Sequence, residues 1–121
     1  MKPDTAALRH ELAGFTGTGT YFRHALARGI LYTEGVQHFA ERAGAYWLLD
    51  IIATQPEIVR PMKEDGFVIV SLHSEGGKGS IVASDGDGHI YYRRELDYTD
   101  CPEGVWKLYF ANNVILLPSE Y

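Results

Sequence analysis

The sequence predicts an α+β domain: an antiparallel β-meander sheet with two to three helices, mainly from the N-terminal half, packed on one face. Apolar residues recur at helical spacing as far as about Gln55, and from Phe67 onwards they alternate with polar residues. A period near ~3.6 residues is typical of an amphipathic helix, and a period of ~2 is typical of a strand that buries one side. Turn-forming glycines and asparagines separate the alternating segments, as in successive β-hairpins.

The length of the chain fits a single domain that spans residues 1–121. The composition, 45% hydrophobic and 22% charged, is that of an ordinary globular protein. No apolar run approaches the ~20 residues of a membrane-spanning helix, so we expect no membrane partner. The single cysteine, Cys101, cannot form an intrachain disulfide, which favours a reducing compartment and a cytoplasmic location.

Capping residues and glycines delimit the helices of the first half. Asp4 or Thr5 can cap a first helix, and Thr33 can cap a second. Glycines then stop these helices, and two prolines bracket a connector before the sheet. The expected order is a helix ending near Ala13, strands at 21–26 and 30–33, a helix from Thr33 to Gly44, a helix at 45–54 and a connector between Pro56 and Pro61.

Five candidate strands follow in the second half of the chain. Glycine-rich or asparagine-rich turns join most of them, and the segment 98–104 is the longest loop of this region. Four successive hairpin-like connections predict that each strand pairs with the next one along the chain. The candidate strands are residues 67–73, 80–84, 89–96, 106–111 and 114–117.

Charge is unevenly distributed along the chain. Residues 1–62 carry six acidic and six basic side chains, whereas residues 63–121 carry ten acidic against five basic. The net charge of −5 therefore lies in the second half, where it disfavours nucleic-acid phosphates and suits a basic partner. Solvated turns and sheet rims explain the same residues without a partner. Asp97 and Asp100 are the candidate acidic binding residues.

Strand parity predicts a candidate binding face on the sheet. One set of alternating residues faces the helices, and the other set presents tyrosines beside cations on the opposite face. Such side chains suit a protein contact, and the same rings could stack the bases of single-stranded nucleic acid. A mixed polar face with tyrosines packed across strands is the purely structural alternative. The inward set is Val68, Val70, Leu72, Ile90, Tyr92, Trp106, Leu108 and Phe110, and the candidate binding residues of the outward set are Tyr91, Arg93, Lys107 and Tyr109.

A second candidate site surrounds Asp50, which follows Tyr46 and Trp47 in an otherwise apolar helical stretch. A buried carboxylate must be paired or protonated, so Asp50 is the best candidate for a perturbed acid. His24 alternates with apolar neighbours and is expected to point inward, so that His24, Tyr46 and Asp50 could line a pocket between helices and sheet. An aspartate that simply ties two elements together is the structural alternative.

We expect no bound metal and no cofactor. The histidines and the cysteine lack the spacing of a zinc or iron site. The segment Asp85-Gly86-Asp87-Gly88 lacks the flanking carboxylates of a calcium loop and predicts a hairpin turn instead. The glycine-rich segment 76–79 does not match a phosphate-binding loop and leads into a strand.

Several stretches of the chain resemble a bacterial family of unknown function, whose members are single-domain proteins of this size that are often carried on plasmids, phages and integrated elements. The resemblance runs from the first helix to the last residue and supplies no catalytic or binding residues. It implies a mobile-element setting and an accessory role toward host or element machinery. The stretches that carry it are Phe15-Thr16-Gly17-Thr18, Tyr32-Thr33-Glu34-Gly35, Ala43-Gly44-Ala45-Tyr46-Trp47-Leu48-Leu49-Asp50, Tyr98-Thr99-Asp100 and Leu117-Pro118-Ser119-Glu120-Tyr121.

The leading hypothesis is a non-enzymatic protein-interaction module that acts on, for example by inhibiting, a host nucleic-acid-handling or defence complex. The alternatives are a small enzyme or ligand-binding domain with a pocket around Asp50, and single-stranded nucleic-acid binding through the Tyr/Arg face. An edge strand at 114–117 could pair with a second copy, which leaves a homodimer open. The ring of Tyr121 is expected to dock on the domain, so that removing residues 119–121 lowers the melting temperature.

Overall fold

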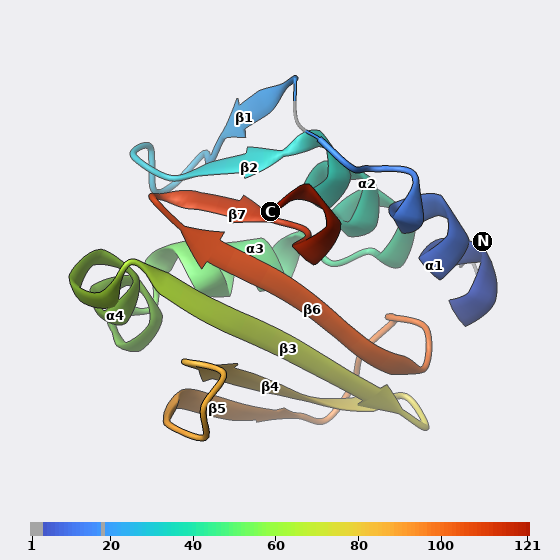
Figure 1. Cartoon of the computed structure of the whole chain (residues 1–121). Coiled ribbons are helices and arrows are strands. Elements are labelled where there is room, and N and C mark those ends of the chain that lie inside the picture. The colour runs from blue at the N-terminus through green and yellow to red at the C-terminus, as the bar shows by residue number, and fades with distance from the viewer. Residues whose placement is uncertain (1–3, 18) are drawn as a thin grey trace.

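The structure is a computed structural model that describes residues 4–17 and 19–121 (Figure 1). This part of the chain forms four α-helices and a seven-stranded, mostly antiparallel sheet, which confirms the predicted α+β class. The helices are α1 (Thr5–Ala13), α2 (Glu34–Ala43), α3 (Tyr46–Thr54) and α4 (Pro56–Asp65), with a closing 3₁₀ turn η1 (Pro118–Glu120). The strands are β1 (Tyr21–Arg23), β2 (Leu31–Thr33), β3 (Phe67–Glu75), β4 (Lys78–Ser84), β5 (Ile90–Leu96), β6 (Gly104–Ala111) and β7 (Val114–Leu116).

The predicted helix starts are confirmed by their capping bonds. The Asp4 carboxylate accepts a hydrogen bond from the backbone N–H of Ala7 at 2.6 Å, and the Thr33 hydroxyl accepts one from Val36 at 3.1 Å. Each bond satisfies a backbone donor that has no partner inside its helix. At the end of α2, Gly44 adopts a left-handed conformation with φ of 65°, which a residue without a side chain adopts at no steric cost.

The prediction of a connector between Pro56 and Pro61 is wrong, because these residues lie within helix α4. Pro56 occupies the first turn, where the missing N–H has no helical acceptor in any case. Pro61 removes one interior hydrogen bond, at a cost of about 3 kcal/mol. Ile58 and Met62, four residues apart, are 0% and 2% exposed on one side of the helix. Burial of each side chain contributes about 1.5–3 kcal/mol, which offsets the proline.

The predicted meander is found only in part. The strand order is β1-β2-β7-β6-β3-β4-β5, so β3, β4 and β5 pair successively, as β6 and β7 do. The chain then leaves β5 and returns to the other side of β3, where β6 pairs antiparallel with it over eight residue pairs. β7 pairs in parallel with β2. This pairing joins the strands of the N-terminal half to those of the C-terminal half in one sheet. Long-range pairing of this kind leaves no local signal in the turns that sequence analysis uses.

The core lies on the side of the sheet where the predicted inward residues point, and Figure 1 shows α3 behind β6 and β7, and α2 behind the turn η1. Val68, Leu72 and Phe110 are 0% exposed, in one cluster with apolar residues of all four helices. The inward set is thus confirmed on β3 and β6. On β5 it holds for Tyr92, which packs against the core, and fails for Ile90, which is 44% exposed.

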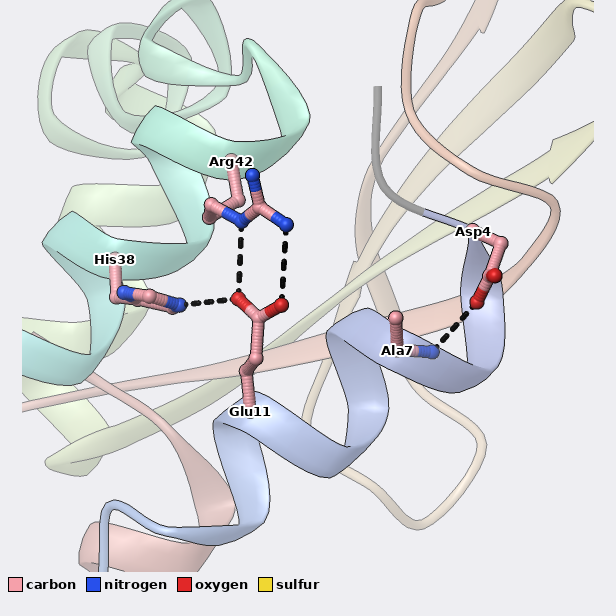
Figure 2. A network of polar contacts seen from close by, with 5 residues as sticks. All are labelled: Asp4, Ala7, Glu11, His38 and Arg42. Carbon is pink, nitrogen blue, oxygen red and sulfur yellow. Dashed lines mark hydrogen bonds and ion pairs between the residues drawn. The ribbon is translucent and has the colours of Figure 1, made fainter. Parts of the chain in front are cut away.

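A polar network joins α1 to α2 (Figure 2). The carboxylate of Glu11 accepts hydrogen bonds from Nε and Nη2 of Arg42 at 3.0 and 3.1 Å, and it pairs with Nε2 of His38 at 2.6 Å. The bonds from Arg42, and then from His38, lower the pKa of Glu11 to about 2. Together with Leu8, which is 0% exposed, this network fixes α1 on the domain.

Candidate interaction surface

The face of the sheet opposite the core is named the outer face. Its residues are set by register: Ile69 pairs with Tyr109 and Ser84, and Ser71 pairs with Lys107 and Val82. Almost all of its side chains are half-buried or exposed, whereas the inward side chains Val68, Val70 and Leu72 of β3 and Trp106, Leu108 and Phe110 of β6 are buried. In Figure 1 the turn η1 lies in front of the sheet. The outer face comprises Phe67, Ile69, Ser71, His73 and Glu75 of β3, Lys78, Ser80, Val82 and Ser84 of β4, Ile90, Arg93 and Glu95 of β5, Val105, Lys107, Tyr109 and Ala111 of β6, Val114 and Leu116 of β7, Tyr21 and Arg23 of β1, and Leu31 and Thr33 of β2.

Three aromatic rings pack together on the outer face. Phe67 lies against Tyr109 with ring centroids 4.9 Å apart, and Tyr121 contacts both rings at 5.4 Å. All three pairs meet edge to face, an arrangement that adds about 0.5–1.5 kcal/mol per pair to area burial. The ring of Tyr121 therefore docks as expected, although the residue is still 73% exposed. The cluster offers a rigid apolar surface to solvent.

Two of the predicted cations lie in one row across the outer face. Lys107 pairs with Ser71, Ser71 with Val82, and Val82 with Arg93, so the row crosses β6, β3, β4 and β5. Neighbouring strands lie about 4.8 Å apart, which separates the two cations by roughly 14 Å at the backbone. Tyr109 belongs to the next row and lies beside Lys107 on β6. Lys107, Arg93 and Tyr109 are thus brought to one face as predicted.

Tyr91 does not join them, because a β-bulge shifts the register of β5. Ala83 pairs with Tyr92 but Ser84 pairs with Ile90, which leaves Tyr91 as the extra residue. Its hydroxyl donates to the Asp65 carboxylate at the end of α4, 3.1 Å away, and its ring packs against the core. Burial and then this bond raise the pKa of Tyr91. The bulge also explains why Ile90 lies on the outer face rather than inward.

The acidic candidates lie in the loop between β5 and β6. Asp97 is exposed, and Asp100 accepts a hydrogen bond from the hydroxyl of Tyr98. That bond raises the pKa of Tyr98. Asp100 also lines a hollow of about 550 Å³ that includes Asp50, Trp47 and Arg94. The fold therefore brings Asp100 of the loop and Asp50 of α3 to one hollow, whereas sequence analysis assigned them to two separate candidate sites.

Asp50 and His24 form a hydrogen-bonded pair, and this pair links helix α3 to the segment that follows β1. Nδ1 of His24 accepts hydrogen bonds from the backbone N–H groups of Leu26 and Ala27, at 3.2 and 3.0 Å. The ring proton is therefore assigned to Nε2, which donates to Oδ1 of Asp50 at 2.8 Å. His24 is 4% exposed, as predicted, whereas the Asp50 side chain is 56% exposed and not buried. With both nitrogens engaged, His24 has no lone pair for a substrate.

Tyr46 lies apart from this pair. Its hydroxyl donates to Glu41 at 2.9 Å, and it does not line the hollow beside Asp50. Burial, followed by the bond to Glu41, raises the pKa of Tyr46 to about 12. The expected pocket of His24, Tyr46 and Asp50 is thus not assembled as a trio.

Phe67 was not among the predicted site residues, and the predicted docking of Tyr121 was not assigned to this face. Alternation along β3 places Phe67 on the same face as Ile69, which could have identified it. No pattern could have placed Tyr121, because η1 turns the chain back over the sheet. Among the described residues, no group of three or more His, Cys, Asp or Glu side chains could hold a metal ion, and no helix is long and apolar enough to cross a membrane.

Comparison with protein families gives a match over nearly the whole chain. A family model described as "Family of unknown function (DUF6876)" covers residues 6–121. The chain belongs to DUF6876. Comparisons with curated proteins and with solved structures gave no significant match.

Proposed function

We propose that this protein is a non-enzymatic protein-interaction module and that its outer face binds the partner. The observation that carries the proposal is the position of the exposed apolar side chains. Seven large hydrophobic side chains are exposed among the described residues, and four of them, Tyr21, Ile90, Val105 and Tyr121, lie on the outer face, spread from β1 to β5. The other three, Leu26, Tyr46 and Tyr98, lie in loops or at a helix start. Exposed apolar side chains that share one face with polar residues are typical of an interaction site.

The chemistry of the face supports a protein partner. The ring cluster of Phe67, Tyr109 and Tyr121 loses little side-chain entropy on binding, because its rings already pack on one another. Lys107 and Arg93 lie beside the apolar surface, where cations act on association rate and orientation. Tyrosine and arginine are also residue types enriched at interfaces.

Two other functions are less well supported by the geometry. An enzyme would need a base with a free lone pair near a reactive group, and both nitrogens of His24 are engaged. A base-stacking platform would need Tyr91 beside Arg93, but the bulge directs Tyr91 towards α4. The hollow beside Asp50 remains the best alternative site, for a small ligand.

The partner we propose is a host protein complex that handles nucleic acids or defends the cell, and the protein acts on it as an accessory of a mobile element. This part of the proposal rests on the sequence resemblance described above. Inhibition of that complex is the form of action that such a setting favours.

The test is retention of proteins from a bacterial lysate on the immobilised domain. The variant Arg93→Glu/Lys107→Glu reverses the two outer-face cations, and Arg60→Glu/Lys63→Glu makes the same charge change on α4 as a matched control. We expect the α4 variant to retain the wild-type set of proteins and the outer-face variant to lose it, with equal melting temperatures. Identical retention by both variants would contradict the outer face as the site. An Asp50→Lys variant that then lost the retained protein would move the site to the hollow beside α3.

A further inference from the structure

Strand β6 is paired along only part of one edge. β3 pairs with β6 from Gly104 to Ala111, but β7 on the other side pairs only with Tyr109, Phe110 and Ala111. β7 ends at Leu116, and Pro118 then begins η1, which leaves the edge of β6 and turns the chain onto the outer face. The first half of β6 therefore has an edge that no strand of residues 4–17 and 19–121 covers.

Side chains of α1 occupy part of this edge. The hydroxyl of Thr5 donates to the carbonyl of Glu103 at 2.6 Å, and Nη2 of Arg9 donates to the carbonyl of Val105 at 2.9 Å. Alternate residues of a strand direct their backbone N–H and C=O to the same side. Residues 103, 105, 107, 109 and 111 thus point to this edge. Lys107 lies between the carbonyls that α1 satisfies and the residues that β7 satisfies.

The N–H and C=O of Lys107 have no hydrogen-bond partner among the described residues on this edge. They open into a hollow of about 410 Å³ between α1, β6 and η1. Its walls are mainly apolar and include Leu12 of α1, Leu108 of β6 and Pro118 of η1. A free donor and acceptor of a strand, set in an apolar groove, are the elements with which sheet edges bind extended peptides.

The charges around the groove are of one sign. Arg9 and Lys107 are the only charged residues that line it among the described residues, in a protein whose net charge is −5. The guanidinium of Arg9 stacks over Trp106, with Cζ 4.4 Å from the ring centroid, and is held there by its bond to Val105. A carboxylate of an incoming segment would thus meet a cation that is already in place.

We propose that this groove binds an extended peptide segment of a partner protein, which adds to β6 as a short strand. The segment pairs with the N–H and C=O of Lys107, places a carboxylate beside Arg9, and lays an apolar side chain between Leu12 and Pro118. The carboxylate belongs either to an Asp or Glu side chain or to the C-terminus of the partner. This site shares Lys107 with the outer face, but it uses the backbone edge of β6 and the helix α1 rather than the side chains of that face.

The probe is a phage-displayed library of random nonapeptides, selected on the whole immobilised protein. The best peptide is then synthesised as a free acid, as a C-terminal amide, and with N-methyl groups on alternate residues, and its affinity is measured by fluorescence polarisation. We expect the selected peptides to carry an acid next to an apolar residue. One of the two N-methylated series should bind at least about tenfold more weakly, since it lacks the backbone donor. A C-terminal amide that binds more weakly than the free acid would show that the carboxylate is the C-terminus, and equal affinity would assign it to an Asp or Glu side chain.

Two variants of the protein isolate the backbone contact. Lys107→Pro removes the edge N–H, which the ladder to β3 does not use, and Lys107→Ala removes the side chain and keeps the N–H. We expect Lys107→Pro to weaken the peptide about tenfold or more and Lys107→Ala to weaken it less than about threefold. Arg9→Gln should lower the affinity for the acidic peptides, because it removes the positive charge that meets their carboxylate. Equal binding by Lys107→Pro and Lys107→Ala, or failure of the library to enrich any peptide, would overturn the proposal.

A measurement on the wild-type protein tests the same contact in case the proline variant does not fold. Hydrogen exchange of the Lys107 amide should slow at least about tenfold when the peptide is bound, because a strand then covers the edge. Unchanged exchange would overturn the proposal, as would sedimentation showing that the edge instead pairs with a second copy. Peptide binding that survives Arg93→Glu, a change on β5 that does not touch the groove, with loss of the lysate proteins, would show that the two sites are separate. Loss of the peptide site alone leaves the outer-face proposal standing.

Discussion

The two faces of the sheet are built from the same strands but follow different rules. On the inner face, Val68, Leu72 and Phe110 are 0% exposed and packed in one core. On the outer face, Ile90 and Val105 remain 44% and 37% exposed, beside cations and a ring cluster. The inner face is fixed by the free energy of burial, and the outer face is free to vary with what it binds. Stability should therefore depend mainly on one face, and partner binding mainly on the other.

The largest expected effect comes from neighbouring residues that point to opposite faces. Phe110→Ala leaves a cavity in the core and should lower the free energy of unfolding by about 3–5 kcal/mol. Tyr109→Ala, one residue earlier on β6, removes a half-buried ring and should cost about 1–2 kcal/mol. Urea unfolding followed by tryptophan fluorescence measures both values. Equal losses for the two variants would break the distinction between the faces.

A smaller effect is expected where η1 crosses from the core to the outer face. Oε1 of Glu120 accepts hydrogen bonds from the hydroxyl of Thr33, at 2.6 Å, and from the backbone N–H of Leu117, at 2.9 Å. Thr33 is 1% exposed, so Glu120→Ala leaves a buried donor without its acceptor and should cost about 1–3 kcal/mol. Glu120→Gln keeps an acceptor oxygen and should cost less than half as much. A wild-type melting temperature for Glu120→Ala would show that η1 is not held by these bonds.

The smallest effect should come from the network that holds α1, which belongs to neither face. The pKa of Glu11 is lowered from 4.5 to about 2, so its contribution is complete above about pH 4.5 and is lost as the pH falls through about 2. The difference in urea midpoint between wild type and Glu11→Gln should therefore shrink steadily between these two pH values. The two proteins should unfold most alike below about pH 2, where the carboxyl of Glu11 is protonated in the folded protein as well. A difference that does not change with pH would show that Glu11 acts through packing and not through its charge.

The helices show which features of the fold the local sequence predicts and which it does not. Asp4, Thr33 and Gly44 have the predicted capping roles, because the geometry of a cap involves only residues within one turn. The connector predicted from Pro56 and Pro61 is instead helical, because burial of Ile58 and Met62 outweighs the unfavourable helix propensity of proline. Propensity is a weak guide wherever tertiary packing contributes several kcal/mol.

The candidate sites show the same division more sharply. Arg93, Lys107 and Tyr109 were placed on one face by parity alone, and parity failed at Tyr91 because a single extra residue inverts every side chain beyond it. His24 was expected to point inward, but its bond to Asp50 joins residues 26 positions apart. No spacing in the sequence could have revealed that contact.

The sequence by itself determined the α+β class, the helix caps, most strand positions and the inward residues of β3 and β6, since each follows from periodicity or from contacts within a few residues. Only the tertiary structure decided the return of β6 beside β3, the bulge that turns Tyr91 towards α4, and the early departure of β7 that leaves Lys107 uncovered. These features depend on the free energy of contacts between distant segments. That free energy is a property of the packed domain, and no local pattern carries it.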